Sequence, residues 1–278
     1  MDHQVGRIVN YELRITHWRI LYFIICLTVY NSFIRQSANP LIRQSANPPI
    51  RNPLIRQFHP MRKLFLISAV IFVSLLLIKR KNMTWRQSFL KTMYPIIMLK
   101  GKWFPGKNDV VLNSNNKVPA VSFYSLKAIA NNGDTIDFNQ FRGKKVLIVN
   151  TASNCGFTAQ YDALEKLYQQ HKEKLAMLAF PANDFKQQEQ SDDKGIAAFC
   201  KINYGISFPI MHKSQVVKGP EQNTVYQWLT EPEQNGWCSQ APVWNFGKYV
   251  IDENGVLTGF FSQNISPLAK DIRKVIVN

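Results

Sequence analysis

Four cysteines are the residues of this sequence best suited to covalent redox chemistry: Cys26, Cys155, Cys200 and Cys238. No two of them form a C-x-x-C pair, and four are too few for a disulfide scaffold in a chain of 278 residues. In the C-terminal part, His171 and His212 are not at ligand spacing from a cysteine, so the sequence predicts no metal site and no cofactor. The chemistry expected is that of single thiols.

Cys155 lies where a buried strand is expected to give way to a helix. Residues 146–149 form an aliphatic run, the pattern of a strand buried on both faces, and small polar residues follow. From residue 159 onward, tyrosines and leucines recur at helical spacing, so Cys155 is expected at or just before a helix N-terminus. The free N–H groups and the helix dipole there predict a lowered pKa for the Cys155 thiol. The alternative is a small buried residue packed behind the strand.

The elements around Cys155 predict an α/β domain over residues 119–278. A β-hairpin is expected from residues 121–126 and 135–138 around the turn at Asn132-Gly133. The βαβ unit consists of the strand at 146–149, a helix over 159–172 and an apolar strand over 175–180. It is expected to be right-handed with parallel strands, as in a thioredoxin-like fold. Further helices are expected at 192–203, 224–229 and 267–277, and further strands at 206–211, 246–251 and 256–261.

Residues 1–118 differ in composition from the rest of the chain. Residues 1–110 contain 17 basic and three acidic residues, whereas residues 111–278 carry a net charge of only +2. The C-terminal part shows no basic stripe interleaved with aromatic residues, so the overall charge of +16 does not predict a nucleic-acid partner. Residues 34–54 repeat Ile-Arg-Gln-Ser-Ala-Asn-Pro, which predicts a disordered, low-complexity extension over residues 1–60.

A basic start at Met61 and an apolar run over residues 64–78 are typical of the N-terminus of a targeted protein. We therefore expect residues 1–60 to be an upstream extension. The run would span about 22 Å as a helix, and its basic flanks favour an uncleaved membrane anchor over residues 61–82 rather than a signal peptide. The basic residues after the run favour a cytoplasmic C-terminal part, although charge in the extension weakens that orientation.

Residues 83–118 are basic and aromatic, with tryptophans at 85 and 103. Aromatic and basic residues together suit the headgroup region of a membrane, which predicts a juxtamembrane segment. The alternative is an extra N-terminal helix that packs on the folded domain.

Three blocks of sequence resemble the glutathione peroxidase family in its cysteine-containing form. They are Asn-Thr-Ala-Ser-Asn-Cys-Gly-Phe-Thr at 150–158, Phe-Pro-Ala-Asn-Asp-Phe at 180–185 leading to Gln188-Glu189, and Val-Trp-Asn-Phe at 243–246. The resemblance covers about residues 119–278 and implies a thioredoxin-like fold and a peroxidase activity. It implies that Cys155 is the peroxidatic cysteine and that Gln188, Trp244 and Asn245 complete a catalytic tetrad.

The residue types of that tetrad suit the chemistry. Attack on a peroxide needs a thiolate, groups that hold it, and a proton for the departing oxygen. The side chains of Gln188, Trp244 and Asn245 are neutral N–H donors, which can stabilise the sulfur anion without a competing charge. The sequence departs from the family pattern at Ala182, where a second cysteine is common, and in a loop where glycine and proline are frequent, at Lys186, Gln187, Gln190 and Ser191.

Cys200 falls where members of the family that use thioredoxin carry a resolving cysteine. The resemblance thus implies that a Cys155 sulfenic acid condenses with Cys200 and that thioredoxin reduces the disulfide. Cys200 lies on a separate predicted helix, so this bond requires local unfolding, and an inert buried cysteine is the alternative. Cys238 is a weaker second candidate. No basic cluster marks a glutathione site around Cys155, which favours thioredoxin.

The function expected is a monomeric, membrane-anchored thiol peroxidase that reduces hydrogen peroxide and organic or lipid hydroperoxides. A glutathione-dependent peroxidase of the same fold is one alternative. A membrane-tethered thiol redox sensor, which would not consume peroxide continuously, is another. A copper-binding module is disfavoured, because neither a paired cysteine nor a histidine lies near Cys155 in the sequence.

Overall fold

The computed structural model describes residues 82–104 and 106–277, together with Leu66, Ile67, Val70, Ser74 and Arg80. Every described residue belongs to the unit Leu64–Asn278. The expected low-complexity extension and most of the expected anchor at 61–82 therefore lie outside the described residues. Within the described part, no helix is both long and apolar enough to cross a membrane.

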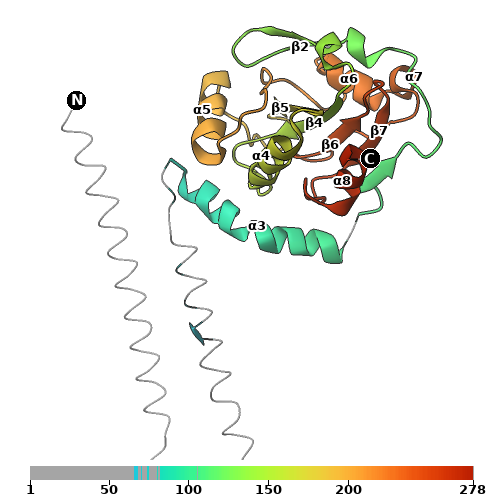
Figure 1. Ribbon diagram of the computed structural model, residues 1–278. Coiled ribbons are helices and arrows are strands. Elements are labelled where there is room, and N and C mark those ends of the chain that lie inside the picture. Colours follow the sequence, from blue (N-terminus) through green and yellow to red (C-terminus); the bar gives the residue numbers. More distant parts are fainter. Residues whose placement is uncertain are drawn as a thin grey trace, which may run out of the picture. The chain divides into compact units, whose positions relative to one another are not determined.

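A five-stranded mixed sheet forms the centre of the folded unit (Figure 1). Its strands, in spatial order, are β1 (Val110–Leu112), β7 (Leu257–Phe261), β6 (Lys248–Ile251), β4 (Lys145–Thr151) and β5 (Leu175–Pro181). Strands β4 and β5 are parallel, with Lys145 opposite Leu175 and Thr151 opposite Pro181, and the other pairs are antiparallel. The expected βαβ unit is present, with the helix between β4 and β5.

Five helices of this unit follow β4 along the chain: α4 (Gln160–His171), α5 (Asp193–Tyr204), α6 (Thr224–Thr230), α7 (Pro232–Asn235) and α8 (Lys270–Val277). The chain order β4-α4-β5-α5, then β6-β7-α8, with strands arranged β7-β6-β4-β5, is that of a thioredoxin-like fold.

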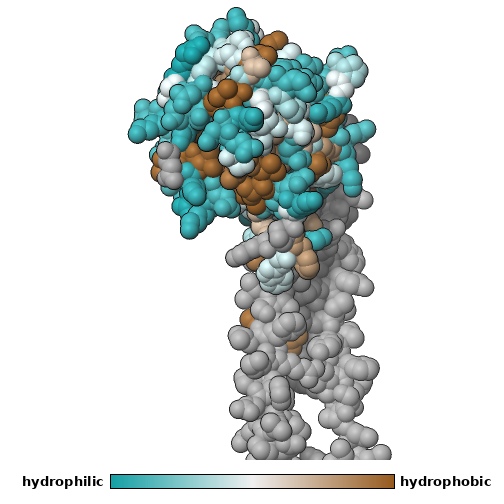
Figure 2. All heavy atoms as spheres, turned by 90° about the vertical axis from the view of Figure 1, so that its right-hand side faces the viewer, coloured by the Kyte–Doolittle hydropathy of each residue, from teal (hydrophilic) through white to brown (hydrophobic). Residues whose placement is uncertain are grey.

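The face shown in Figure 2 is mainly hydrophilic with separated hydrophobic patches.

Two hydrophobic cores lie on the two sides of the sheet. Successive residues of a strand point to opposite faces, so Val146 and Ile148 of β4 join one core, and Leu147 and Val149 join the other. The first core includes residues of α6, and the second includes residues of α4, α5 and α8. The prediction that residues 146–149 form a strand buried on both faces is confirmed, because each is fully buried.

Two expected strands differ from the structure. The hairpin consists of β2 (Lys127–Ile129) and β3 (Thr135–Asp137), so its first strand begins later than predicted. Residues Phe123–Ser125 form a 3-10 turn instead, because the Ser122 hydroxyl accepts from the Tyr124 N–H. Residues 206–211 form only isolated bridges, since Pro209 has no N–H to donate to a neighbouring strand.

The chain before residue 119 also takes part in the fold. Helix α3 (Trp85–Trp103) begins with a capping box, in which the side chains of Thr84 and Gln87 each accept from the other's backbone N–H. Strand β1 then pairs with β7, which places Val110 opposite Phe261. The sheet therefore includes residues that precede the predicted start of the folded domain.

Gly236 and Gly133 both need a backbone conformation that favours glycine, but only Gly236 also lacks room for a side chain. Its φ is +95°, and a Cβ there would lie 2.3 Å from the carbonyl oxygen of Val118. Gly133 has a similar φ of +92° but open space around it. We expect Gly236→Ala to lower the free energy of unfolding by about 3 kcal/mol or more, and Gly133→Ala by about 1 kcal/mol. Urea unfolding measures both, and equal losses would contradict the steric argument.

Candidate active site

Cys155 lies in a tight turn between β4 and α4. The Cys155 N–H donates to the Thr158 hydroxyl oxygen at 3.0 Å, and that hydroxyl lies 2.8 Å from the carbonyl oxygens of Ala152 and Cys155. Helix α4 begins at Gln160 with no side-chain cap. The expected position just before a helix N-terminus is therefore confirmed. The cysteine is 1% exposed.

N–H groups surround the sulfur of Cys155. The Phe157 N–H donates to Sγ at 3.4 Å, and the Gly156 N–H also lowers the pKa of the thiol. From the other end of the chain, the side chains of Trp244 and Asn245 donate to the same sulfur. The two backbone donors follow from the turn before α4, whereas the two side chains come from the segment before β6.

The pKa of Cys155 differs from the sequence-based expectation. Burial raises the pKa of the thiol, because desolvation disfavours the anion, and this effect outweighs the donors from Phe157, Trp244, Asn245 and Gly156. The prediction of a lowered pKa is thus wrong for this closed arrangement. The helix N-terminus favours the thiolate, but the free-energy cost of removing water from the sulfur is larger.

Gln188 meets this group through Asn245. The Asn245 side-chain N–H donates to Gln188 Oε1 at 3.1 Å, and both side chains are buried. The structure therefore brings together all four residues that the resemblance implied: Cys155, Gln188, Trp244 and Asn245. Gln188 acts here as an acceptor for Asn245, whereas the sequence suggested a direct donor to the sulfur.

Asn150, at the end of β4, holds the segment that carries Trp244. Its side-chain N–H donates to the Trp244 carbonyl at 3.1 Å, and its Oδ1 accepts from the Gly247 N–H at 2.9 Å. The Asn150 carbonyl accepts from the Phe246 N–H. An asparagine directly after a predicted buried strand was the only sequence signal for this role, since a buried amide requires partners.

Glu189 joins the loop that carries Gln188 to the loop that carries Cys155. Its Oε2 accepts from the Ser153 N–H at 2.7 Å and from the Ser153 hydroxyl at 2.8 Å. The Asn154 N–H donates to the Gln188 carbonyl at 3.0 Å. Burial raises the pKa of Glu189, and the bonds from Ser153 act in the opposite direction. No role for Glu189 was apparent from the sequence, although Glu189 lies in one of the quoted blocks.

Comparisons with known proteins agree with this geometry. Residues 123–230 match the family model described as glutathione peroxidase. The chain is 42% identical over 157 residues to the glutathione peroxidase-like peroxiredoxin GPX5 of Chlamydomonas reinhardtii, which covers 55% of this chain and 96% of that protein. The chain belongs to the glutathione peroxidase family. The predicted resemblance is confirmed, and the family makes the protein a peroxidase, an oxidoreductase that acts on peroxide.

Two other relatives of this peroxidase extend the comparison. Glutathione peroxidase-like peroxiredoxin 2 of Saccharomyces cerevisiae is 41% identical over 151 residues, which are 54% of this chain and 93% of that protein. Among solved structures, T. cruzi GPX1 is 31% identical, with 56% of this chain and 94% of that chain covered and a TM-score of 0.44.

The loop before Gln188 has an unusual backbone in this peroxidase. Lys186 and Gln187 both adopt left-handed conformations, with φ values of 54° and 52°. These are two of the positions where the sequence departs from the glycine and proline of the family pattern. The Lys186 ammonium lies 5.6 Å from the centre of the Trp244 ring, so the loop also brings one positive charge to the site.

The other described cysteines of the peroxidase are free and buried. Cys200 belongs to the same core as Cys155, whereas Cys238 belongs to the core on the other side of the sheet. Burial raises the pKa of Cys200 to about 12, which a hydrogen bond with Tyr161 partly opposes. Burial also raises the pKa of Cys238 to about 11. Neither thiol is poised as a nucleophile in the closed fold.

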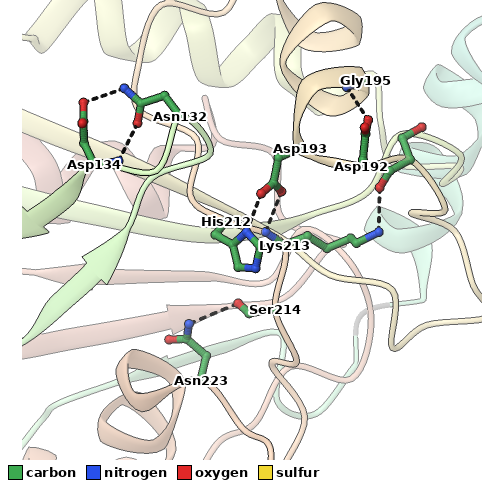
Figure 3. A network of polar contacts seen from close by, with 10 residues as sticks. Asn132, Asp134, Asp192, Asp193, Gly195, His212, Lys213, Ser214 and Asn223 are labelled. Atoms are coloured by element: carbon green, nitrogen blue, oxygen red, sulfur yellow. Dashed lines mark hydrogen bonds and ion pairs between the residues drawn. The ribbon is translucent and has the colours of Figure 1, made fainter.

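A polar network fixes the start of α5, the helix that carries Cys200 (Figure 3). Asp192 caps the helix by accepting from the Gly195 N–H at 2.8 Å. The Asp193 carboxylate contacts His212 and accepts from the Lys213 N–H. The Lys213 ammonium donates to the Ser191 carbonyl, which ties this network to the loop of Gln188. Within the described part of the chain, no group of three or more acidic, histidine or cysteine side chains could hold a metal ion.

The donors around Cys155 predict a measurable pH effect. Trp244→Phe removes one N–H donor to the sulfur, so the pKa of Cys155 should rise further and the thiolate should become scarcer. We expect alkylation of the Cys155 peptide at pH 7 to slow about five- to tenfold, since a tenfold loss of thiolate corresponds to one pKa unit. Peptide-resolved mass spectrometry across pH 6–10 measures this. Trp237→Phe is the control, because its indole donates to the Leu257 carbonyl instead.

An unchanged pH profile in Trp244→Phe would contradict the assignment of Trp244 as a donor to the sulfur. Equal slowing of alkylation in Trp244→Phe and Trp237→Phe would also contradict it, because that result would indicate a general effect of packing.

Proposed function

We propose that this chain is a thioredoxin-dependent thiol peroxidase with Cys155 as its peroxidatic cysteine. The observation that carries the proposal is the convergence of two backbone and two side-chain N–H donors on the sulfur of Cys155. The sulfur attacks one oxygen of the hydroperoxide and the O–O bond breaks. The thiol proton passes to the departing oxygen, so the products are a cysteine sulfenic acid and water or an alcohol.

The tetrad residues have distinct parts in this step. Trp244 and Asn245 stabilise negative charge on the sulfur as the thiol proton leaves. Gln188 positions Asn245, because Gln188 Oε1 accepts a hydrogen bond from the Asn245 side-chain N–H. Asn245 Oδ1 is buried and has no hydrogen-bond partner among the described residues, so the O–H of a hydroperoxide can serve as its donor.

Cys200 is the resolving cysteine in this proposal. Its thiol condenses with the Cys155 sulfenic acid to give a disulfide and water, and the two thiols of thioredoxin then reduce that disulfide while thioredoxin becomes oxidised. One observation supports Cys200 over Cys238: Cys200 lies on the same side of the sheet as Cys155. Burial raises the pKa of both thiols, so either one would need an opening of the fold to react.

Formation of the disulfide therefore requires local unfolding. Cys200 is fully buried on α5, and Tyr161 of α4 contacts its thiol. Opening of α5 or of the turn before α4 would release these contacts and let the sulfurs meet. The polar network of Asp193, His212 and Lys213 holds the first turn of α5, so the proposed opening concerns the later turns, which carry Cys200.

Glutathione is the alternative reductant. The Lys186 ammonium near the Trp244 ring is the specific observation that favours it, because a cation beside the site can hold a carboxylate of an anionic thiol. One cation is less than the cluster that an anionic tripeptide needs, so thioredoxin is preferred. The substrates proposed are hydrogen peroxide and organic or lipid hydroperoxides, and the protein is proposed to act as a monomer.

Steady-state peroxide consumption tests the reaction. The full chain is assayed with thioredoxin and its reductase, or with glutathione and its reductase. We expect Cys155→Ser to lose at least about 1000-fold in rate with both reductants, because the nucleophile is gone. Cys200→Ser should lose the thioredoxin-driven rate, and Cys238→Ser should keep it. Activity that survives Cys155→Ser would overturn the mechanism, and full thioredoxin-driven activity in Cys200→Ser would overturn the resolving role.

We also propose that the apolar run over residues 64–78 anchors the protein in a membrane, as the sequence predicts. One charged residue at the centre of an inserted helix costs about 2.5–3.5 kcal/mol. The full chain with Val70→Asp and Leu75→Asp should therefore be released from membranes by alkaline carbonate, whereas the wild type should resist extraction. Val118→Asp and Ile129→Asp, at exposed apolar positions of the folded unit, form the matched control. Release of the wild type under the same conditions would overturn the anchor.

A further inference from the structure

Helix α3 has an inner face that contacts the turn of Cys155. The Gln87 side-chain amide donates to the Ser153 carbonyl at 3.4 Å. The Ile97 side chain lies 3.3 Å from the point that a Cβ on Gly156 would occupy. Both contacted residues are within two positions of Cys155, so α3 forms one wall beside the site.

Contacts with α4 and α5 hold α3 in this position. The Lys91 ammonium lies 2.9 Å from an oxygen of Asp162 in α4 and 3.9 Å from the centre of the Tyr204 ring in α5. Ser88 on the same helix is almost fully buried. Figure 1 shows α3 along one edge of the folded unit, away from β2 and α6. The helix is thus a fixed part of the described fold.

The opposite face of α3 is apolar and exposed. Phe89, Ile96, Leu99 and Trp103 are between 45% and 71% exposed. Their spacings of seven, three and four residues place them on one side of a helix, and we call these four residues the outer stripe. An exposed apolar stripe along a surface helix is a feature that folded proteins usually cover.

The charge around the outer stripe is of one sign. No aspartate or glutamate occurs between residues 61 and 108, and the exposed residues Arg86, Lys100 and Lys107 lie near the two ends of α3. Two copies of this chain packed through the stripe would bring these positive charges together, which disfavours a dimer. A surface with negative charge over an apolar interior is complementary to both features.

We propose that the outer stripe of α3 lies at the boundary between headgroups and acyl chains of an anionic bilayer. The inner face then holds the turn of Cys155 within about one helix diameter, roughly 10 Å, of the membrane surface. This placement differs from the anchor at residues 64–78, because it uses the folded unit itself and fixes its orientation. It does not depend on the proposed peroxidase reaction.

Vesicle binding tests this inference on the full chain with Val70→Asp and Leu75→Asp, which removes the anchor. The vesicles contain phosphatidylcholine alone or with 30% phosphatidylserine. We expect the anchor-free chain to bind the anionic vesicles and to lose most of that binding in 0.5 M salt. Adding Phe89→Ser, Ile96→Ser and Leu99→Ser should weaken binding at least about 30-fold, since three apolar side chains no longer leave water.

A matched control carries Val118→Ser, Ile129→Ser and Ile202→Ser, three exposed apolar residues outside α3. Its vesicle binding should stay within about twofold of the anchor-free chain. Both triple variants should keep the unfolding midpoint of the anchor-free chain, because the substituted side chains are exposed. Where a midpoint falls, the single variants Phe89→Ser and Leu99→Ser replace the triple, with proportionally smaller losses expected.

The fluorescence of Trp103 gives an independent readout. Lipids brominated on the acyl chains should quench the anchor-free chain, and Trp103→Phe should reduce that quenching while binding remains. Binding that survives loss of the stripe would overturn the inference. So would a concentration-dependent dimer, seen by sedimentation, that the stripe variant abolishes while vesicles are not bound. Loss of peroxidase activity would not affect either readout.

Discussion

The bonds from Ser153 to the buried carboxylate of Glu189 hold the site together. They join the loop of Gln188 to the loop of Cys155, two segments that are far apart in sequence, and the backbone bond from Asn154 to Gln188 lies beside them. A buried carboxylate is costly unless its lone pairs are used, and burial does raise the pKa of Glu189. The bonds from Ser153 offset part of this cost and hold the loop that positions Gln188. Gln188 in turn accepts a hydrogen bond from Asn245. Asn150 joins the third segment, which carries Trp244, to the end of β4.

Burial and hydrogen bonding compete at Cys155. Burial excludes water from the sulfur and raises its pKa, while four N–H groups act in the other direction. The net result is a raised pKa, because burial outweighs the four donors. The same burial isolates Cys200 and Cys238, with one thiol on each side of the sheet. Of these two thiols, only that of Cys200 shares a core with Cys155.

Helix α3 illustrates why one composition supported two interpretations. Basic and aromatic residues predicted a segment at a membrane surface, with a helix packed on the domain as the alternative. In the structure the helix packs on the turn of Cys155 through residues such as Gln87 and Ile97, and its other face remains apolar and exposed. The two interpretations concern opposite faces of one helix. Composition cannot separate them, because the assignment of residues to faces depends on the register of the helix against the domain.

The sequence by itself determined the succession β4-α4-β5-α5, the buried strand before Cys155, the turn at Asn132-Gly133 and the family. These depend on local patterns: apolar runs, helical spacing, and short blocks of residues. Only the tertiary structure decided the direction of the Cys155 pKa shift, the roles of Asn150 and Glu189, and the side of the sheet on which Cys200 and Cys238 lie. It also showed that residues before 119 join the sheet. The physical reason is that burial and hydrogen bonds between distant segments appear only once the chain has folded.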